Sequence, residues 1–151
     1  MNPYQTHALE GANPVELTIA LYDGIVRFMN QAIHAVELND TDQRRAAVKR
    51  AMDIVMHLQV TLDRKQGGEP AEALTEFYTA IFALMLQGSQ ANSRQKFEQV
   101  IANVSNVREA WKQALVETAL TSANGTGSVS SKFGDVMPHL SVSPREGSWT
   151  A

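Results

Sequence analysis

The residues of this sequence that could bind a transition metal or accept a phosphoryl group are its four histidines, His7, His34, His57 and His139. Di-iron carboxylate bundles place a glutamate three residues before each metal-binding histidine, so that both ligands project from one helix face. None of the four histidines has a glutamate at that position. The chain also lacks cysteine, which excludes c-type haem attachment, thiolate metal sites, disulfides and cysteine nucleophiles. We therefore expect no metal site and no cofactor.

Histidine phosphotransfer is a second chemistry to consider, since phosphotransfer bundles present an exposed histidine on a helix. His34 falls on a polar helix face but is followed by Ala-Val-Glu rather than by lysine and glycine, and His57 has no basic cluster beside it. Catalysis requires polar or titratable groups that converge in a pocket, whereas the inner helix faces of this chain are aliphatic and aromatic. We expect a protein that is not an enzyme, with no catalytic residues, and keep phosphotransfer as the least favoured alternative.

Length, charge and composition narrow the class of protein further. A chain of 151 residues is long enough for one domain that buries its own core. The net charge of -3 and the lack of a basic stripe argue against nucleic acid as a partner. The N-terminus has neither the basic nor the apolar region of a signal peptide, and no segment approaches about 18 consecutive apolar residues. We expect a soluble, cytoplasmic protein without membrane insertion.

Four segments with helical periodicity must position any functional side chain. Their expected bounds are Asn13 to Leu38, Thr41 or Asp42 to about Lys65, Pro70 to near Gly88, and Ser93 to about Leu120. The expected N-caps are Asn13 for the first helix, Thr41 or Asp42 for the second and Ser93 for the fourth. Short connections make sequential helices antiparallel neighbours. We therefore predict an all-α, antiparallel up-down four-helix bundle domain over residues 1–120, which includes a short N-terminal arm over 1–12. Glycine, serine and proline make up 13 of the 31 residues from 121 to 151, which predicts a flexible, disordered tail.

Apolar spacing also predicts the core of the last three helices. The expected inward-facing residues are Val48, Ala51, Val55, Leu58 and Leu62 in the second helix, Leu74, Phe77, Tyr78, Ile81, Leu84 and Met85 in the third, and Phe97, Val100, Ile101, Val104, Val107, Trp111, Leu115 and Thr118 in the fourth.

The first helix is apolar over roughly 200° of its circumference, against the usual face of about 100°. We predict one stripe that faces the core (Leu17, Leu21, Gly24 and Phe28) and a second that faces outward (Ile19, Tyr22, Val26 and Met29). Gly24 would let a neighbouring helix approach closely. Excess apolar residues also occur on the second and third helices, namely Met52, Met56, Val60, Phe82 and Leu86. Such surface usually marks an interaction site, although a helix with several neighbours or a homodimer interface would bury it as well.

Four short motifs stand in order along residues 2–118. They are Asn13-Pro14-Val15-Glu16-Leu17 with Leu21-Tyr22-Asp23-Gly24, then Leu62-Asp63 with Gly67-Gly68-Glu69, Leu74 and Tyr78, then Val107-Arg108-Glu109-Ala110-Trp111, and Asn2-Pro3-Tyr4 near the N-terminus. Together they resemble the motifs of the flagellar secretion chaperones, the family that holds flagellin before export.

The resemblance implies a cytoplasmic, non-enzymatic helical bundle that binds the disordered C-terminal segment of flagellin in apolar grooves. Such binding prevents premature polymerisation and keeps flagellin competent for flagellar type III secretion. By the same resemblance, the arm around Tyr4 and Leu9 covers part of the groove until the client displaces it. The flagellar export apparatus and regulatory proteins are further candidate partners.

The resemblance and the apolar stripes together suggest two sets of residues. As flagellin-binding residues we expect Tyr4, Leu9, Ile19, Tyr22, Val26, Met29, Met52 and Met56. As structural motif residues we expect Leu17, Leu21, Gly24, Leu62, Gly67, Gly68, Tyr78 and Trp111. We expect a monomer or a weak homodimer, and the alternative from a different class is a self-associating structural bundle.

Overall fold

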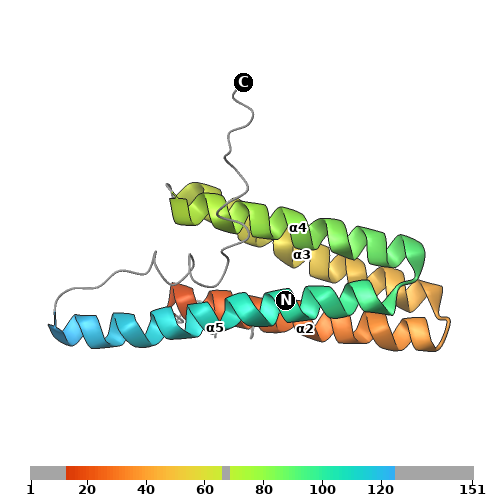
Figure 1. Cartoon of the computed structure of the whole chain (residues 1–151), viewed down its shortest axis with the longest axis horizontal. Helices are drawn as coiled ribbons and strands as arrows, with labels where there is room; N and C mark the ends of the chain where they lie inside the picture. Colours follow the sequence, from red (N-terminus) through yellow and green to blue (C-terminus); the bar gives the residue numbers. More distant parts are fainter. Residues whose placement is uncertain (1–12, 66–68, 125–151) are drawn as a thin grey trace, which may run out of the picture.

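The computed structural model describes residues 13–65 and 69–124, which form four α-helices and no strands (Figure 1). The helices are α2 (Pro14–Glu37), α3 (Thr41–Lys65), α4 (Glu69–Ala91) and α5 (Arg94–Asn124). The prediction of an all-α four-helix bundle is confirmed. The arm over 1–12, the Gly67-Gly68 pair and the tail from residue 125 lie outside the described residues.

The helices are arranged so that α2 and α4 lie diagonally opposite each other, each between α3 and α5. Cross-helix contacts fix the antiparallel directions: Arg94 at the start of α5 pairs with Glu37 at the end of α2, and Arg44 near the start of α3 donates to Ser89 near the end of α4. Packing is closer around α2 than around α4. At one end of the bundle, α5 extends past the other helices (Figure 1).

Local side-chain hydrogen bonds set where α2 and α3 begin. Asn13 caps α2 by accepting from the backbone N–H groups of Val15 and Glu16, and Glu16 accepts in return from the Asn13 N–H. The cap of α3 is Asp40, whose carboxylate accepts from the Gln43 N–H at 3.0 Å. The expected cap at Thr41 or Asp42 is therefore wrong, because Asn39 reverses the chain one residue earlier with a positive φ of 55°.

The end of α4 also differs from expectation, since Gly88 lies inside the helix and the chain turns only at Asn92, where φ is 53°. A Cβ atom on Gly88 would lie 2.8 Å from Cε1 of Phe97, so this glycine allows α4 and α5 to approach closely. Ser93 caps α5 as predicted, accepting from the Lys96 N–H. That helix runs four residues beyond its expected end at Leu120.

The core agrees closely with the predicted stripes of α3, α4 and α5. All five predicted residues of α3 are buried, as are five of α4 (all but Leu84) and Phe97, Val100, Val104 and Val107 of α5. Leu84, Ile101, Trp111 and Leu115 are half-buried at its margin, and the side chain of Thr118 is not among the described ones. The aliphatic and aromatic character expected of the core is thus observed, and no polar or charged residue is buried among the described side chains.

Candidate functional site

Three of the six exposed large apolar side chains in the described region occur on α3 and α4. Met56 is 52 % exposed, Val60 is 50 % exposed and Leu86 is 40 % exposed. Half-buried Met52 and Phe82 continue these rows at four-residue spacing. We call these five residues the α3–α4 strip.

The opposite flanks of α3 show why the strip must lie along α4. Ile54 and Arg50 occupy the flank that faces α2, since Ile54 lies against Gly24 and Arg50 lies over the ring of Phe28. Met52 and Met56 each lie two residues from Ile54, about 160° around the helix in either direction, and so fall on the other flank. The neighbour on that flank is α4.

The flank of α4 that meets the strip is identified in the same way. Ser89 accepts a hydrogen bond from Arg44 of α3, which places Ser89 on the side of α4 toward α3. Phe82 lies two helical turns before Ser89, on the same side, and Leu86 extends that row outward. Met52, Met56, Phe82 and Leu86 therefore line one seam of the bundle, and Val60 continues the row of Met52 and Met56 onto the solvent-facing side of α3.

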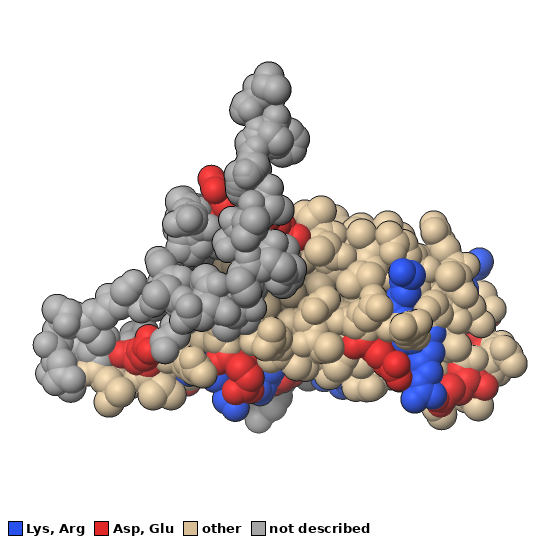
Figure 2. Space-filling view, in the orientation of Figure 1, with Lys and Arg blue, Asp and Glu red and all other residues tan. Residues whose placement is uncertain are grey.

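Charge is missing from the chain on both sides of this seam. Residues 54–62 of α3 and residues 77–93 of α4 and the following turn contain no Asp, Glu, Lys or Arg. Figure 2 shows the result as a broad uncharged area over the α4 side of the bundle. Uncharged surface with exposed apolar side chains is typical of a site that binds another apolar segment.

The outward-facing stripe predicted on α2 is partly wrong. Tyr22 and Met29 are fully buried, whereas Ile19 and Val26 are half-buried. The reason is that α2 touches both α3 and α5 and faces α4 across the core, so its wide apolar arc is used for internal packing. The polar side of α2 is exposed as expected. Of the remaining predicted binding residues, Met52 and Met56 lie on the α3–α4 strip, and Tyr4 and Leu9 lie outside the described residues.

The predicted structural residues occupy the core or its edge. Gly24, Leu62 and Tyr78 are buried, and Leu17, Leu21 and Trp111 are half-buried. A Cβ atom on Gly24 would lie 3.0 Å from Cδ1 of Ile54, which agrees with the expected close approach of a helix there. Val60, Phe82 and Leu86 were not among the predicted flagellin-binding residues, although the sequence already marked them as excess apolar residues. Val60 is four residues from Met56, and Phe82 is four residues from Leu86.

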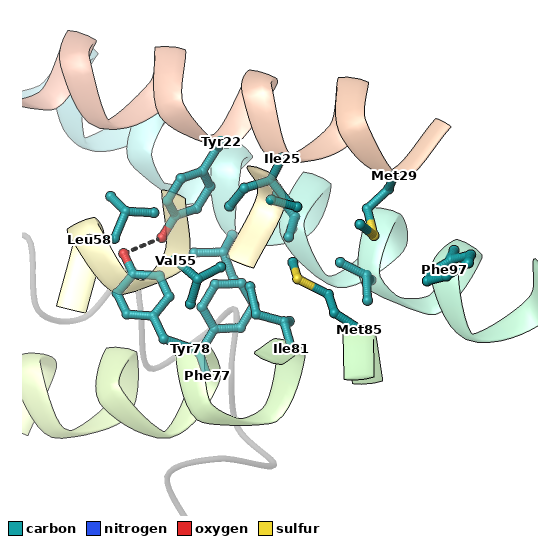
Figure 3. Packing of buried hydrophobic residues seen from close by; sticks show 14 of the residues in the cluster. Tyr22, Ile25, Met29, Val55, Leu58, Phe77, Tyr78, Ile81, Met85 and Phe97 are labelled. Atoms are coloured by element: carbon teal, nitrogen blue, oxygen red, sulfur yellow. Dashed lines mark hydrogen bonds between the residues drawn. The ribbon is translucent and has the colours of Figure 1, made fainter. Parts of the chain in front are cut away.

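Three aromatic residues from three helices form a hydrogen-bond network that sequence reasoning missed. The hydroxyl oxygens of Tyr22 and Tyr78 lie 2.8 Å apart across the diagonal of the bundle (Figure 3), and Trp111 Nε1 of α5 donates to the Tyr22 hydroxyl at 3.0 Å. Burial raises the pKa of Tyr22 and of Tyr78 above the ordinary tyrosine value, because the phenolate form would lose its hydration. The network joins α2, α4 and α5 at one level of the core.

The histidines of the described region do not gather into a site. His34 and His57 are both exposed, on α2 and α3 respectively. Within residues 13–65 and 69–124, no group of three or more His, Asp or Glu side chains is placed to hold a metal ion. None of the four described helices is long and apolar enough to cross a membrane.

Comparison with known proteins adds an independent line of evidence. The sequence model of the family described as "Flagellar protein FliS" matches residues 1–118. Three proteins with the name "Flagellar secretion chaperone FliS" are similar to this chain. The Salmonella typhimurium protein is 34% identical over 107 residues, covering 70% of this chain and 79% of its own length. The Campylobacter jejuni protein is 33% identical over 112 residues (74% and 88%), and the Bacillus subtilis protein is 28% identical over 126 residues (83% and 92%).

Proposed function

Because the chain belongs to the FliS family of flagellar secretion chaperones, we propose that it is a cytoplasmic export chaperone whose client is flagellin. The client segment is the disordered C-terminal part of flagellin, which the bundle holds in a form that cannot polymerise and can still be secreted. The protein acts by binding rather than by catalysis. Further contacts with the export apparatus or with regulatory proteins would use other surfaces of the bundle.

The α3–α4 strip is the observation that carries this proposal. Its exposed side chains recur at four-residue spacing on two antiparallel helices, and residues 54–62 and 77–93 contain no charged residue. From Met52 to Val60 the strip extends for about 12 Å along α3, or roughly two turns of a client helix. An amphipathic helix could place apolar side chains between the two rows, as in other helix-in-groove complexes.

The methionines suit a surface that accepts an unfolded client. Met52 and Met56 have flexible, polarizable side chains that adapt to the shape of the segment bound to them. A client that folds on binding loses conformational entropy, and burial of its apolar side chains against the strip offsets that loss. Ile19 and Val26 are half-buried on α2, and Val26 lines the hollow between α2 and α3, so neither residue belongs to the α3–α4 strip. Tyr22 and Met29 have no exposed surface with which to contact a client.

Isothermal titration calorimetry with a synthetic C-terminal segment of the cognate flagellin tests this proposal. We expect saturable one-to-one binding, weakened at least about tenfold by Val60→Asp, because a carboxylate placed in an apolar contact loses its hydration. The matched control is Val116→Asp on α5. Val116 is 59 % exposed and Val60 is 50 % exposed, and valine and aspartate have similar helix propensities.

Three results would contradict the proposal. The first is the absence of saturable binding to the native chain. The second is equal weakening by the two valine variants, with far-ultraviolet circular dichroism confirming that both remain helical. The third is a stable dimer in sedimentation velocity that Val60→Asp dissociates, which would assign the α3–α4 strip to self-association.

A further inference from the structure

Two arginines from neighbouring helices lie against one aromatic ring on the opposite seam of α3. The guanidinium carbon of Arg27, on α2, is 4.9 Å from the ring centroid of Phe28, and that of Arg50, on α3, is 5.9 Å from the same centroid. Phe28 is itself half-buried against the core. Cation–π attraction to a ring that is fixed in this way restrains both cationic groups beside Phe28.

Neither arginine has a counter-charge in the described part of the chain, where the ion pairs involve other residues. Asp23 is near this surface, but Arg108 of α5 holds both of its carboxylate oxygens. Two cationic groups on one surface that form no ion pair attract an anionic group. Arg27 and Arg50 are therefore suited to bind an acidic group that is not part of residues 13–65 and 69–124.

The two arginines belong to the wall of an open hollow of about 710 Å³ between α2 and α3. Val26, Ala46 and Ala47 supply apolar lining, while amide side chains such as Asn30 and Gln31 can donate hydrogen bonds. Asp23 lines the hollow as well, with its carboxylate paired to Arg108. Small-molecule sites usually enclose most of their ligand. This hollow is open to solvent and lies along a seam between two helices, so a peptide segment suits it better than a small anion.

We propose that the α2–α3 hollow binds an acidic peptide segment of a partner protein, with Arg27 and Arg50 receiving its carboxylates. A guanidinium group can donate two parallel hydrogen bonds to one carboxylate, which gives orientation as well as attraction. A helical segment with glutamates four residues apart presents two carboxylates on one face. The apolar lining then packs against the alanine-sized side chains between them.

This hollow is distinct from the proposed flagellin site. Arg50 lies on the flank of α3 that faces α2, whereas Met56 lies on the flank that faces α4. A client on the α3–α4 strip therefore leaves the hollow accessible. A partner that binds there could recognise the chaperone while its client is bound.

Fluorescence anisotropy with a labelled helical peptide that has glutamate at every fourth position tests the inference. The probe is compared with the same peptide in which glutamine replaces each glutamate. We expect the glutamate peptide to bind more tightly, with a dissociation constant that rises with salt. Arg27→Gln and Arg50→Gln should each raise that constant by about tenfold, since each removes one carboxylate-binding group.

The matched control is Arg45→Gln, which makes the same change of charge on an exposed residue of the same helix. Arg45 lies about 140° around α3 from Arg50 and should change binding by less than about twofold. Equal weakening by Arg45→Gln would show unspecific attraction to a basic surface and overturn the inference. Equal binding of the two peptides would overturn it as well. Arg27→Gln and Arg50→Gln should not weaken binding of the flagellin segment. If they weakened it as much as they weaken binding of the glutamate peptide, the hollow would be part of the client site and the proposal of a separate site would be refuted.

Discussion

Replacement of Tyr22 by phenylalanine removes one hydroxyl that is hydrogen-bonded to two other polar groups. The Tyr78 hydroxyl loses its partner at a position that is 2 % exposed, and the indole N–H of Trp111 loses this acceptor. A buried polar group left without a partner costs about 1–3 kcal/mol. We expect Tyr22→Phe to lower the free energy of unfolding by about 2 kcal/mol, mainly because the buried Tyr78 hydroxyl loses this partner.

The network predicts an unequal pair of single variants and a non-additive double variant. Tyr78→Phe leaves the hydrogen bond between Trp111 and Tyr22 intact, so its cost should be only about 1 kcal/mol. The double variant removes both hydroxyls, so no orphaned tyrosine hydroxyl remains in the core. It should be more stable than Tyr22→Phe alone by about 1 kcal/mol, since two apolar groups of matching shape replace a hydrogen-bonded pair at small cost.

Urea unfolding followed by circular dichroism at 222 nm measures these differences. With a slope of about 2 kcal/mol per molar urea, Tyr22→Phe should lower the midpoint by about 1 M. Thr79→Val is the control, because it removes an exposed hydroxyl on α4, the helix of Tyr78. That hydroxyl donates to the backbone carbonyl of Thr75 in the same helix, and we expect almost no shift in the urea midpoint. Equal losses for Tyr22→Phe and Tyr78→Phe, or a double variant whose loss equals their sum, would refute the reasoning.

Two further predictions concern alkaline pH and the glycines. Because burial raises the pKa of Tyr22 and Tyr78 in the folded state, the unfolded chain releases these protons first, and stability that is complete below about pH 10 should fall as pH rises above it. Urea midpoints from pH 8 to 11.5 should show this fall in the native chain and a weaker one in the Tyr22→Phe/Tyr78→Phe variant; an unchanged slope would contradict it. Gly88→Ala should lower the thermal midpoint despite a gain of about 1 kcal/mol in helix propensity, because its Cβ meets the fully buried ring of Phe97. Gly24→Ala should be nearly neutral, since its Cβ meets only the flexible end of a half-buried isoleucine, and equal midpoints for the two glycine variants would show that the Phe97 contact is unimportant.

The helices could be predicted because their signals are local. The Asn13 capping box and the Ser93 cap act within three residues, and the inner faces of α3, α4 and α5 repeat every three or four residues. Gly88 was misread as a helix end because glycine serves both as a helix terminator and as a site of close packing. Its neighbour Phe97 decides between these roles, and that contact exists only after α4 and α5 have packed.

The candidate binding surface could be predicted only in part. The sequence shows how much apolar surface each helix has, and it marked Met52, Met56, Val60, Phe82 and Leu86 as excess. It does not show which excess is covered by a neighbour. The surplus of α2 is largely buried because this helix packs closely on both sides, whereas the looser contact between α3 and α4 leaves their surplus exposed.

By itself, the sequence determined the all-α class, the four helices, most of the core and the family of this chain, because capping, periodicity and short motifs act over a few residues. The tertiary structure alone decided that Tyr22 and Met29 face inward, that the exposed apolar surface lies on the α3–α4 strip, and that Tyr22, Tyr78 and Trp111 meet in one network. These contacts join residues as far as 89 positions apart. Their geometry depends on which helices become neighbours and how closely each pair packs.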